Sequence, residues 1–261
     1  MPAPFAVAEQ TWVIPMTLPV GEDGVLPLNP VLIRGEQPVL ADTGPAVLRG
    51  EFLDALFSLV DPGDLKWVFL SHDDRDHAGN LMELLDLCPA ARLVTSSQGF
   101  MRLTKEWAFP AARVVLLGEG ERLPIGDRQI RSSRPPLFDS PATRGLYDTR
   151  TGVYYGVDCF AALLPEYYQL AQDVPAGLYA AGFAWLNRAN APWYALTDPV
   201  RLGREVGRVR RLDPPVIVSY HGPPAYGMAG RLCDLLEAMP RDGDIQFPRL
   251  DELMGCLDAA R

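Results

Sequence analysis

The sequence has few of the residues that mark several common protein classes. Its 261 residues include only four cysteines, with no Cys-x-x-Cys pair among them, so a disulfide-rich secreted fold is excluded and a reducing cytoplasm is expected. No run of about 18 uncharged apolar residues is present, and no basic residue precedes the apolar stretch near the N-terminus. We therefore expect neither a membrane span nor a signal peptide. A glycine-rich phosphate-binding loop is also absent.

Positive charge is scarce as well. Lysine and arginine number 24 against 33 aspartates and glutamates, a formal net charge of −9 that repels phosphate backbones and anionic lipid. Nucleic acids and membrane surfaces are therefore not expected partners. Hydrophobic residues make up 48% and charged residues 22% of the chain, which is typical of a globular protein and excludes a disordered or fibrous one. The length fits one α/β domain, residues 1–261.

The hydrophobic pattern predicts an α/β protein made of two β-then-α halves, roughly 1–110 and 111–261. Strands are expected at 12–19, 29–35, 38–42, 66–72, 91–97, 112–117, 123–133, 153–158 and 215–221. Helices are expected at 51–60, 80–87, 198–212, 232–239 and 250–260. The proline-rich segment 134–152 is expected to be a loop, and the aromatic segment 154–194 a hydrophobic cap over a sandwich in which helices cover two packed sheets.

Histidine is among the scarcest residues, since the chain has only three. His72 and His77 lie five residues apart in SHDDRDHAGN, directly after an apolar strand whose carboxyl end is a usual place for ligands. In an extended loop the alternate residues His72, Asp74 and Asp76 would point to one side, and His77 to the other side of a turn. The loop is thus expected to bring two imidazoles and two or three carboxylates close together, and this set of donors suits iron, manganese or zinc.

Two remote residues extend this candidate metal site. Asp158 ends the strand VYYGVD, and His221 ends the strand PVIVSYH and is followed by Gly222, which lets the backbone approach closely. All three histidines thus become candidate ligands.

The neighbours of these residues have other expected roles. Asp73 and Arg75 are expected to face solvent or to pair with each other. Cys159 should face away from Asp158 and be buried rather than bind metal. Tyr220 and Tyr226 flank His221, where they could line the pocket, donate a proton or pack in the core.

The order LADTGP, SHDDRDHAGN, GVYYGVD and VSYHG resembles the metallo-β-lactamase fold. The resemblance runs from about residue 29 to about residue 221, and it implies a four-layer αββα sandwich. In that family an HxHxDH motif, a later histidine, an aspartate and a final histidine build a two-metal site. Asp42 would match the family's structural aspartate, which supports the metal loop.

The third motif position holds Asp74 in place of histidine, and this is similar to the flavodiiron proteins and related oxygen-binding di-iron proteins. That resemblance implies one metal on His72, Asp74 and Asp158, and a second on Asp76, His77, the bridging Asp158 and His221. A carboxylate at this position favours iron over zinc and eases the change between ferrous and ferric states.

The family supplies another histidine between the two halves, and this chain has none left. In the matching segment RPPLFDSPATRG, Asp139 is the candidate replacement ligand. The alternative is that Asp139 starts a turn with Ser140 and Pro141.

Three functions are consistent with these residues. The first is a non-haem iron oxidoreductase with one or two irons, which binds or activates O₂ and acts on O₂ or a small organic substrate. The second is a zinc or manganese hydrolase of an ester, thioester or lactone, in which the metal lowers the pKa of a water held by Asp76 to about 7. The third is a sensor that holds O₂ or another ligand without turnover.

Only 40 residues follow His221, too few for the flavodoxin domain of a flavodiiron protein, so no flavin is expected in this chain. Electrons for redox work would then come from another protein or from the substrate. By the same resemblance to oxygen-handling proteins, we expect the chain to form a homodimer.

Overall fold

The computed structural model describes residues 1–21, 24–243 and 245–247, and the chain divides into two compact units. The first unit comprises residues 1–16, 29–135 and 140–155, and the second comprises 17–28, 136–139 and the chain from 156 onward. The helix expected at 250–260 and the fourth cysteine, Cys256, lie outside the described residues. The division into halves near residue 110 stays a prediction.

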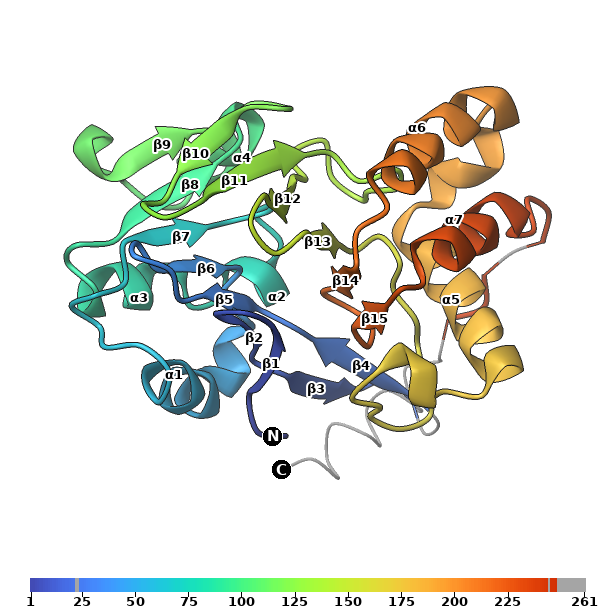
Figure 1. The fold of residues 1–261 in the computed structure, drawn as a ribbon, viewed down its shortest axis with the longest axis horizontal. Coiled ribbons are helices and arrows are strands. Elements are labelled where there is room, and N and C mark those ends of the chain that lie inside the picture. Colours follow the sequence, from blue (N-terminus) through green and yellow to red (C-terminus); the bar gives the residue numbers. More distant parts are fainter. Residues whose placement is uncertain (22–23, 244, 248–261) are drawn as a thin grey trace. The chain divides into compact units, whose positions relative to one another are not determined.

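The first unit contains a seven-stranded sheet in the order β1-β2-β5-β6-β7-β8-β9 (Figure 1). Its first four strands are antiparallel, and from β6 onward neighbouring strands are parallel. The residues of β6, β7 and β8 are mostly buried, as is typical of the short apolar runs of a parallel sheet. Their bounds are β1 Phe5–Ala8, β2 Thr11–Val13, β5 Val31–Ile33, β6 Val39–Ala41, β7 Trp67–Phe69, β8 Arg92–Thr95 and β9 Val114–Leu116.

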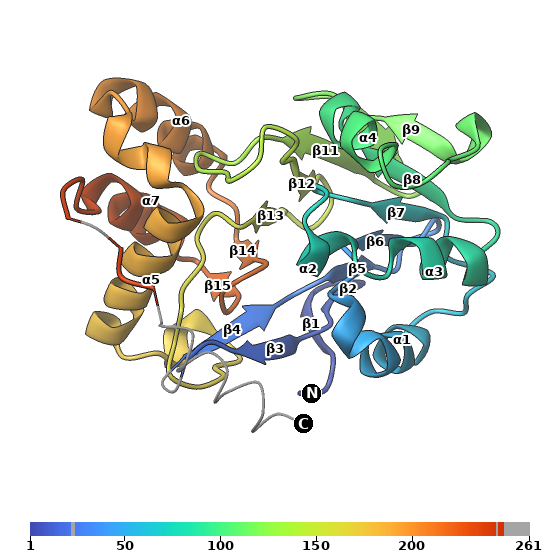
Figure 2. The same cartoon turned by 180° about the vertical axis from the view of Figure 1, so that it is seen from behind.

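Helices connect the parallel strands of this sheet, as parallel pairing requires. They are α1 Arg49–Phe57, α2 Arg75–Ala78, α3 Leu81–Leu87 and α4 Ser97–Leu103, with short 3₁₀ turns at Ala46–Leu48 and Ala111–Arg113. Figures 1 and 2 show α1 and α3 on the same face of the sheet. Because β6 and β7 are parallel neighbours, the residues that follow both strands meet at one edge of the sheet.

The remaining strands of the first unit are antiparallel: β10 Arg122–Pro124, β11 Gln129–Ser133, β12 Gly145–Asp148 and the start of β13 Val153–Val157. The expectation that 134–152 is entirely loop is wrong, because β12 lies inside it. Its sequence GLYD has no apolar run and is surrounded by turn-forming residues, so it does not stand out as a strand. Gly145 reflects the pairing, since a Cβ there would lie 2.3 Å from the carbonyl oxygen of Tyr155.

The second unit holds a two-stranded sheet of β3 Met16–Pro19 and β4 Val25–Leu28, and the antiparallel pair β14 Val216–Ser219 and β15 Ala225–Tyr226. The last residue of β13, Val157, accepts a hydrogen bond from the Tyr220 N–H at 2.7 Å. The ends of β13 and β14 are thereby fixed next to each other within this unit.

Helices make up most of the second unit: α5 Ala176–Asn190, α6 Pro199–Leu212 and α7 Ala229–Ala238, with 3₁₀ turns at Ala171–Asp173 and Pro192–Leu196. Helix α5 occupies part of the segment expected to be an aromatic cap. Tyr179 and Phe183, four residues apart, are buried on one side of it, so packing is the role of these aromatics. No helix in the described part of the chain is both long and apolar enough to cross a membrane.

A buried ion pair joins the turn before β11 to the end of β12 in the first unit. The Nη1 of Arg128 lies 3.1 Å from Oδ2 of Asp148, and both side chains are almost fully buried. Burial opposes the charge on Arg128, but hydrogen bonds and charge from Asp127 and Asp148 raise its pKa. Asp148 also accepts from the Arg150 N–H and the Thr151 hydroxyl.

Replacing Asp148 by alanine leaves the Arg128 guanidinium with one carboxylate fewer in a buried position. We expect Asp148→Ala to lower the free energy of unfolding by about 3–5 kcal/mol, measured by urea titration. Arg150→Ala, which removes a half-exposed partner of Asp127, is the control and should change it by about 1 kcal/mol or less. Equal effects of the two substitutions would contradict this role for the buried pair.

Candidate metal centre

Asp42 is the hub of the candidate site in the first unit. It follows β6 directly, its backbone is left-handed with φ 60°, and it is fully buried. Its carboxylate accepts four hydrogen bonds: from the N–H and the hydroxyl of Ser71, both at 2.8 Å, from Nδ1 of His77 at 2.8 Å and from the Tyr155 hydroxyl at 2.6 Å. Four donors saturate a carboxylate. The structure thus gives Asp42 the supporting place that the resemblance implied.

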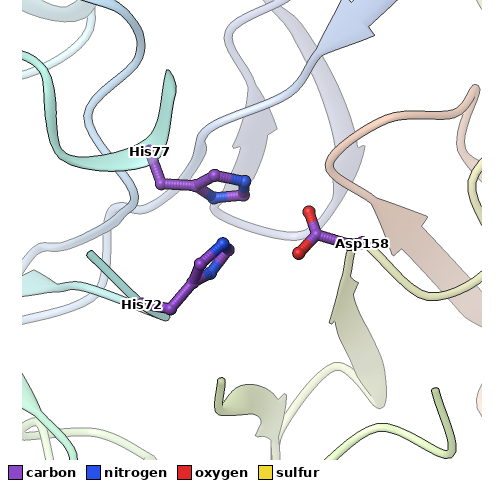
Figure 3. A group of neighbouring side chains, drawn as sticks. All are labelled: His72, His77 and Asp158. Carbon is purple, nitrogen blue, oxygen red and sulfur yellow. The ribbon is translucent and has the colours of Figure 1, made fainter. Parts of the chain in front are cut away.

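The imidazoles of His72 and His77 lie against each other, with ring centroids 4.1 Å apart (Figure 3). The two imidazoles thus lie close together, as the motif predicts, but this arrangement does not come from the expected extended loop. Its cause is local: Arg75–Ala78 form the helical turn α2, in which the N–H of His77 bonds to the carbonyl of Asp74 at 3.0 Å. Successive side chains then rotate by about 100° rather than alternating as in a strand.

The hydrogen bonds fix which nitrogen of each ring can bind metal. Nδ1 of His77 faces the Asp42 carboxylate and must carry the proton. The Ser71 hydroxyl donates to Asp42, so it accepts from Nδ1 of His72 at 3.0 Å. In both neutral rings the lone pair is therefore on Nε2, and such a carboxylate–histidine arrangement is typical of metal ligands.

Each Nε2 atom has a carboxylate oxygen near it. Nε2 of His72 lies 3.8 Å from Oδ2 of Asp74, and Nε2 of His77 lies 3.6 Å from Oδ2 of Asp76. Two donor atoms that bind one cation at about 2.1 Å are roughly 3.0–3.5 Å apart. Both pairs are close to this spacing, so the donor set of the first unit fits a metal ion.

The second unit presents a similar pair. Asp158 follows β13, as Figure 3 shows, and His221 comes shortly after β14. Nε2 of His221 lies 3.2 Å from Oδ1 of Asp158, and its Nδ1 donates to the carbonyl of Pro27 at 3.1 Å. The lone pair of His221 is again on Nε2. As expected for Gly222, a Cβ there would come within 3.1 Å of the Phe160 carbonyl oxygen.

The loop that carries Asp158 is strained. Val157 has φ 56° and Phe160 has φ 67°, values that are rare for residues other than glycine and most costly for a β-branched one. Strain of this kind gathers at functional sites and persists only where surrounding contacts enforce it. Here the carbonyl of Val157 accepts from the Tyr220 N–H and from the Ser219 hydroxyl.

Asn187 of α5 provides the second restraint on this loop. The side chain is buried, accepts from the Phe160 N–H at 3.0 Å, and donates to the carbonyls of Ala161 and Phe183 at 2.8 Å each. Sequence reasoning missed Asn187, as it missed Ser71 and Tyr155. The available signal was an uncharged polar residue on the apolar face of a helix.

The acidic and basic neighbours of the motif point outward. Asp73 pairs with Arg102, whose Nε lies 2.6 Å from its Oδ1, and Arg75 pairs with Glu106 and lies over the Trp107 ring. Of the two expected arrangements, exposure to solvent holds for Arg75, whose side chain is 65% exposed, whereas the ion-pair partners of Arg75 and Asp73 are Glu106 and Arg102 rather than each other. The helical turn α2 directs Arg75 to partners elsewhere on the surface.

The remaining candidates have distinct places in the second unit. Cys159 is buried, and burial raises the pKa of its thiol, so it stays protonated and is a poor metal ligand. Tyr220 is fully buried, its ring edge-on to His221 at 4.9 Å, whereas Tyr226 is half-buried. Asp139 is exposed, and the adjoining turn begins at Ser140, whose carbonyl accepts from the Thr143 N–H.

Comparison with known proteins identifies the family. The family model described as ODP family beta lactamase matches residues 26–222. The chain belongs to this family. A flavodiiron core, Flv1 of Synechocystis, has a similar fold, with a TM-score of 0.74 at 19% identity over 90% of this chain and 61% of that one. The predicted metallo-β-lactamase type of α/β fold is confirmed.

Two curated relatives are similar in sequence to this member of the ODP family. An uncharacterized protein of Methanocaldococcus jannaschii is 23% identical over 74% of this chain and 48% of its own length. The rubredoxin-oxygen oxidoreductase of Megalodesulfovibrio gigas is 30% identical over 64% of this chain and 40% of its own. The chain thus spans about half or less of the length of these relatives.

Removing the Tyr155 hydroxyl takes one donor from the buried Asp42 carboxylate. Tyr155→Phe is expected to lower the free energy of unfolding by about 1.5–3 kcal/mol, as for a hydrogen bond to a charged group, measured in urea. Tyr147→Phe on the adjacent strand, where the ring is half-buried, is the matched control and should have an effect below about 0.5 kcal/mol. A neutral Tyr155→Phe would contradict the role of Asp42 as hub.

Asn187→Ala should release the Asp158 loop, because the Phe160 N–H then lacks its buried acceptor. We expect a loss of unfolding free energy of at least about 1–3 kcal/mol, together with a smaller rise in melting temperature on adding Fe²⁺ or Zn²⁺. Asn190→Ala, at the end of the same helix, serves as the control. A stability loss without any change in the metal-induced rise would show that Asn187 does not act on the metal site.

Proposed function

We propose that the chain is a metal-dependent oxidoreductase whose non-haem iron site, with one or two irons per chain, binds or activates O₂. The observation that carries the proposal is Asp74, whose carboxylate stands at the third motif position and lies 3.8 Å from Nε2 of His72. A carboxylate in place of an imidazole adds negative charge and a hard donor, which favours iron and stabilises its ferric state.

The proposed ligands follow the family pattern. His72, Asp74 and Asp158 would bind the first iron, and Asp76, His77, Asp158 and His221 the second. Asp139 is proposed to complete the first site. The support within each unit is that three histidines are oriented to offer Nε2, and that three of the carboxylates lie 3.2–3.8 Å from those atoms.

Bound iron would supply the change between ferrous and ferric states that O₂ chemistry needs. The residues of the chain orient and tune it. Asp42 and Ser71 hold the Nδ1 protons of His77 and His72, which fixes both rings and raises the basicity of Nε2. Tyr220, buried against His221, is the proposed proton donor, and Asp76 would orient a water molecule at the site.

Electrons are proposed to come from a separate donor protein. One relative is named for rubredoxin and oxygen, and another is the anaerobic nitric oxide reductase flavorubredoxin of Salmonella typhi, 29% identical over 51% of this chain. We propose O₂ as the substrate, with a small organic molecule as the alternative, and a homodimer as the assembly. The three described cysteines are free thiols, which agrees with the proposed cytoplasmic location.

The test is the metal content of protein purified under anaerobic conditions, followed by O₂ uptake with a reduced rubredoxin as donor. We expect iron, one or two per chain, and O₂ consumption. Zinc in place of iron, with hydrolysis of a thioester or lactone and no O₂ uptake, would contradict the proposal and support the hydrolase.

Substituting the ligands tests the assignment directly. His77→Ala and His221→Ala should each remove at least one metal equivalent, because each takes an Nε2 donor from a buried position. Asp73→Ala is the control beside the site and should retain full metal content. Asp139→Ala should remove about one equivalent if Asp139 completes the first site. Full retention in both histidine variants would refute the ligand set.

A further inference from the structure

Helix α6 is a concentration of positive charge on an acidic protein (Figure 1). It carries five arginines and one glutamate, whereas the whole chain has a formal net charge of −9. Four of the arginines are exposed and follow one face of the helix at the spacing i, i+3, i+7 and i+10. We call them the arginine stripe: Arg201, Arg204, Arg208 and Arg211.

The structure already uses some of the charge of α6. Arg210, outside the stripe, binds Asp234 and Glu237 of α7, both at 2.8 Å, and so ties the two helices together. Within the stripe, Arg208 pairs with Glu205 at 2.9 Å. Packing of the second unit therefore accounts for Arg210, but not for the arrangement of the stripe.

An apolar groove of about 710 Å³ adjoins the stripe. Phe138, Trp193 and Leu202 line it, and the Trp193 ring is fixed by a hydrogen bond from Nε1 to the Phe138 carbonyl at 2.8 Å. Arg201 and Arg204 line the same groove. Two acidic residues line it too, but both have partners on α6: Asp198 accepts from the Arg201 N–H, and Glu205 pairs with Arg208. Two large apolar side chains are strongly exposed here, Leu196 at 89% and Val200 at 64%.

Protein-binding surfaces typically combine an apolar centre with aromatic and arginine side chains, and the groove beside α6 has this composition. Arginine binds carboxylates through two parallel hydrogen bonds, so the complementary partner is acidic. The rest of the −9 chain repels such a partner, and α6 attracts it. The stripe would thus orient an acidic protein during the encounter.

We propose that the arginine stripe and its groove are the docking surface for an acidic electron-donor protein. The identity of this partner rests on the proposed function, which requires electrons from another protein. The two conditions that such a donor must meet are surface carboxylates that match the stripe and a small apolar patch that covers Leu196 and Val200. Complexes between electron-transfer partners have small interfaces and are short-lived, because the donor must leave after each transfer.

The experiment measures binding of an acidic rubredoxin to the full, metal-loaded chain by titration calorimetry at low salt. Arg201→Glu/Arg204→Glu should raise Kd by at least about tenfold, and Leu196→Ser by a few-fold, because charge and apolar contact both contribute. Arg34→Glu/Arg122→Glu changes the net charge by the same amount at exposed positions of the first unit and should alter Kd by less than about twofold.

Several outcomes would overturn the proposal. One is no binding at all, and another is an equal loss in the two double variants, which would show an effect of net charge alone. A wild-type dimer that Arg201→Glu/Arg204→Glu dissociates would identify a second copy of the chain as the occupant. Capture by phosphatidylserine vesicles that the same variant abolishes would identify a lipid surface.

The docking surface and the proposed function can fail separately. Rubredoxin binding that depends on the stripe, without any O₂ uptake, would support the surface and refute the oxygen chemistry. O₂ uptake that is equal in wild type and in Arg201→Glu/Arg204→Glu at low donor concentration would support the oxygen chemistry and refute the docking surface.

Discussion

The buried carboxylate of Asp42 is the constraint on which the candidate site of the first unit depends. It accepts four hydrogen bonds from three separate segments of the chain. Two come from Ser71, which lies shortly after β7, one from His77 in the turn α2, and one from Tyr155 in β13. Four donors stabilise the carboxylate in its buried position, and the loss of one donor is costly because Asp42 is fully buried. The same contacts fix the tautomers of His72 and His77. Packing of this unit and the orientation of its two histidines therefore depend on the same contacts.

Sequence reasoning could point to the candidate ligands but not to the way they are held. Three histidines and a motif of aspartates after an apolar strand identified His72, Asp74, Asp76 and His77, since ligands recur at strand ends. The direction of His77 could not be predicted, because a four-residue helical turn leaves no periodic signal. Asn187 was missed for a related reason: its partners are backbone groups of a loop whose left-handed residues the sequence does not reveal.

The elements of the fold likewise include some that the sequence predicts and some that it does not. The short apolar strands and α6 were predictable, because an unbroken apolar run marks the strands and a clear helical period marks α6. Strand β12 and helix α5 were not, since β12 lies among turn-forming residues and α5 is masked by a run of aromatic and small residues. Charge is distributed with similar selectivity. Carboxylates outnumber basic side chains in the chain and are the hard donors of the candidate site. Five arginines lie on α6, and four of them are exposed rather than part of the buried core.

The histidine tautomers test the central claim most directly, because three histidines give only three sets of nitrogen signals. Two-dimensional ¹⁵N NMR of the metal-free chain at alkaline pH, repeated after Zn²⁺ is added as a diamagnetic probe, reports the protonation of each ring nitrogen. The account predicts a proton on Nδ1 in all three rings and a shift of all three Nε2 signals on metal binding. Rings protonated on Nε2, or Nε2 signals that Zn²⁺ leaves unchanged, would contradict it.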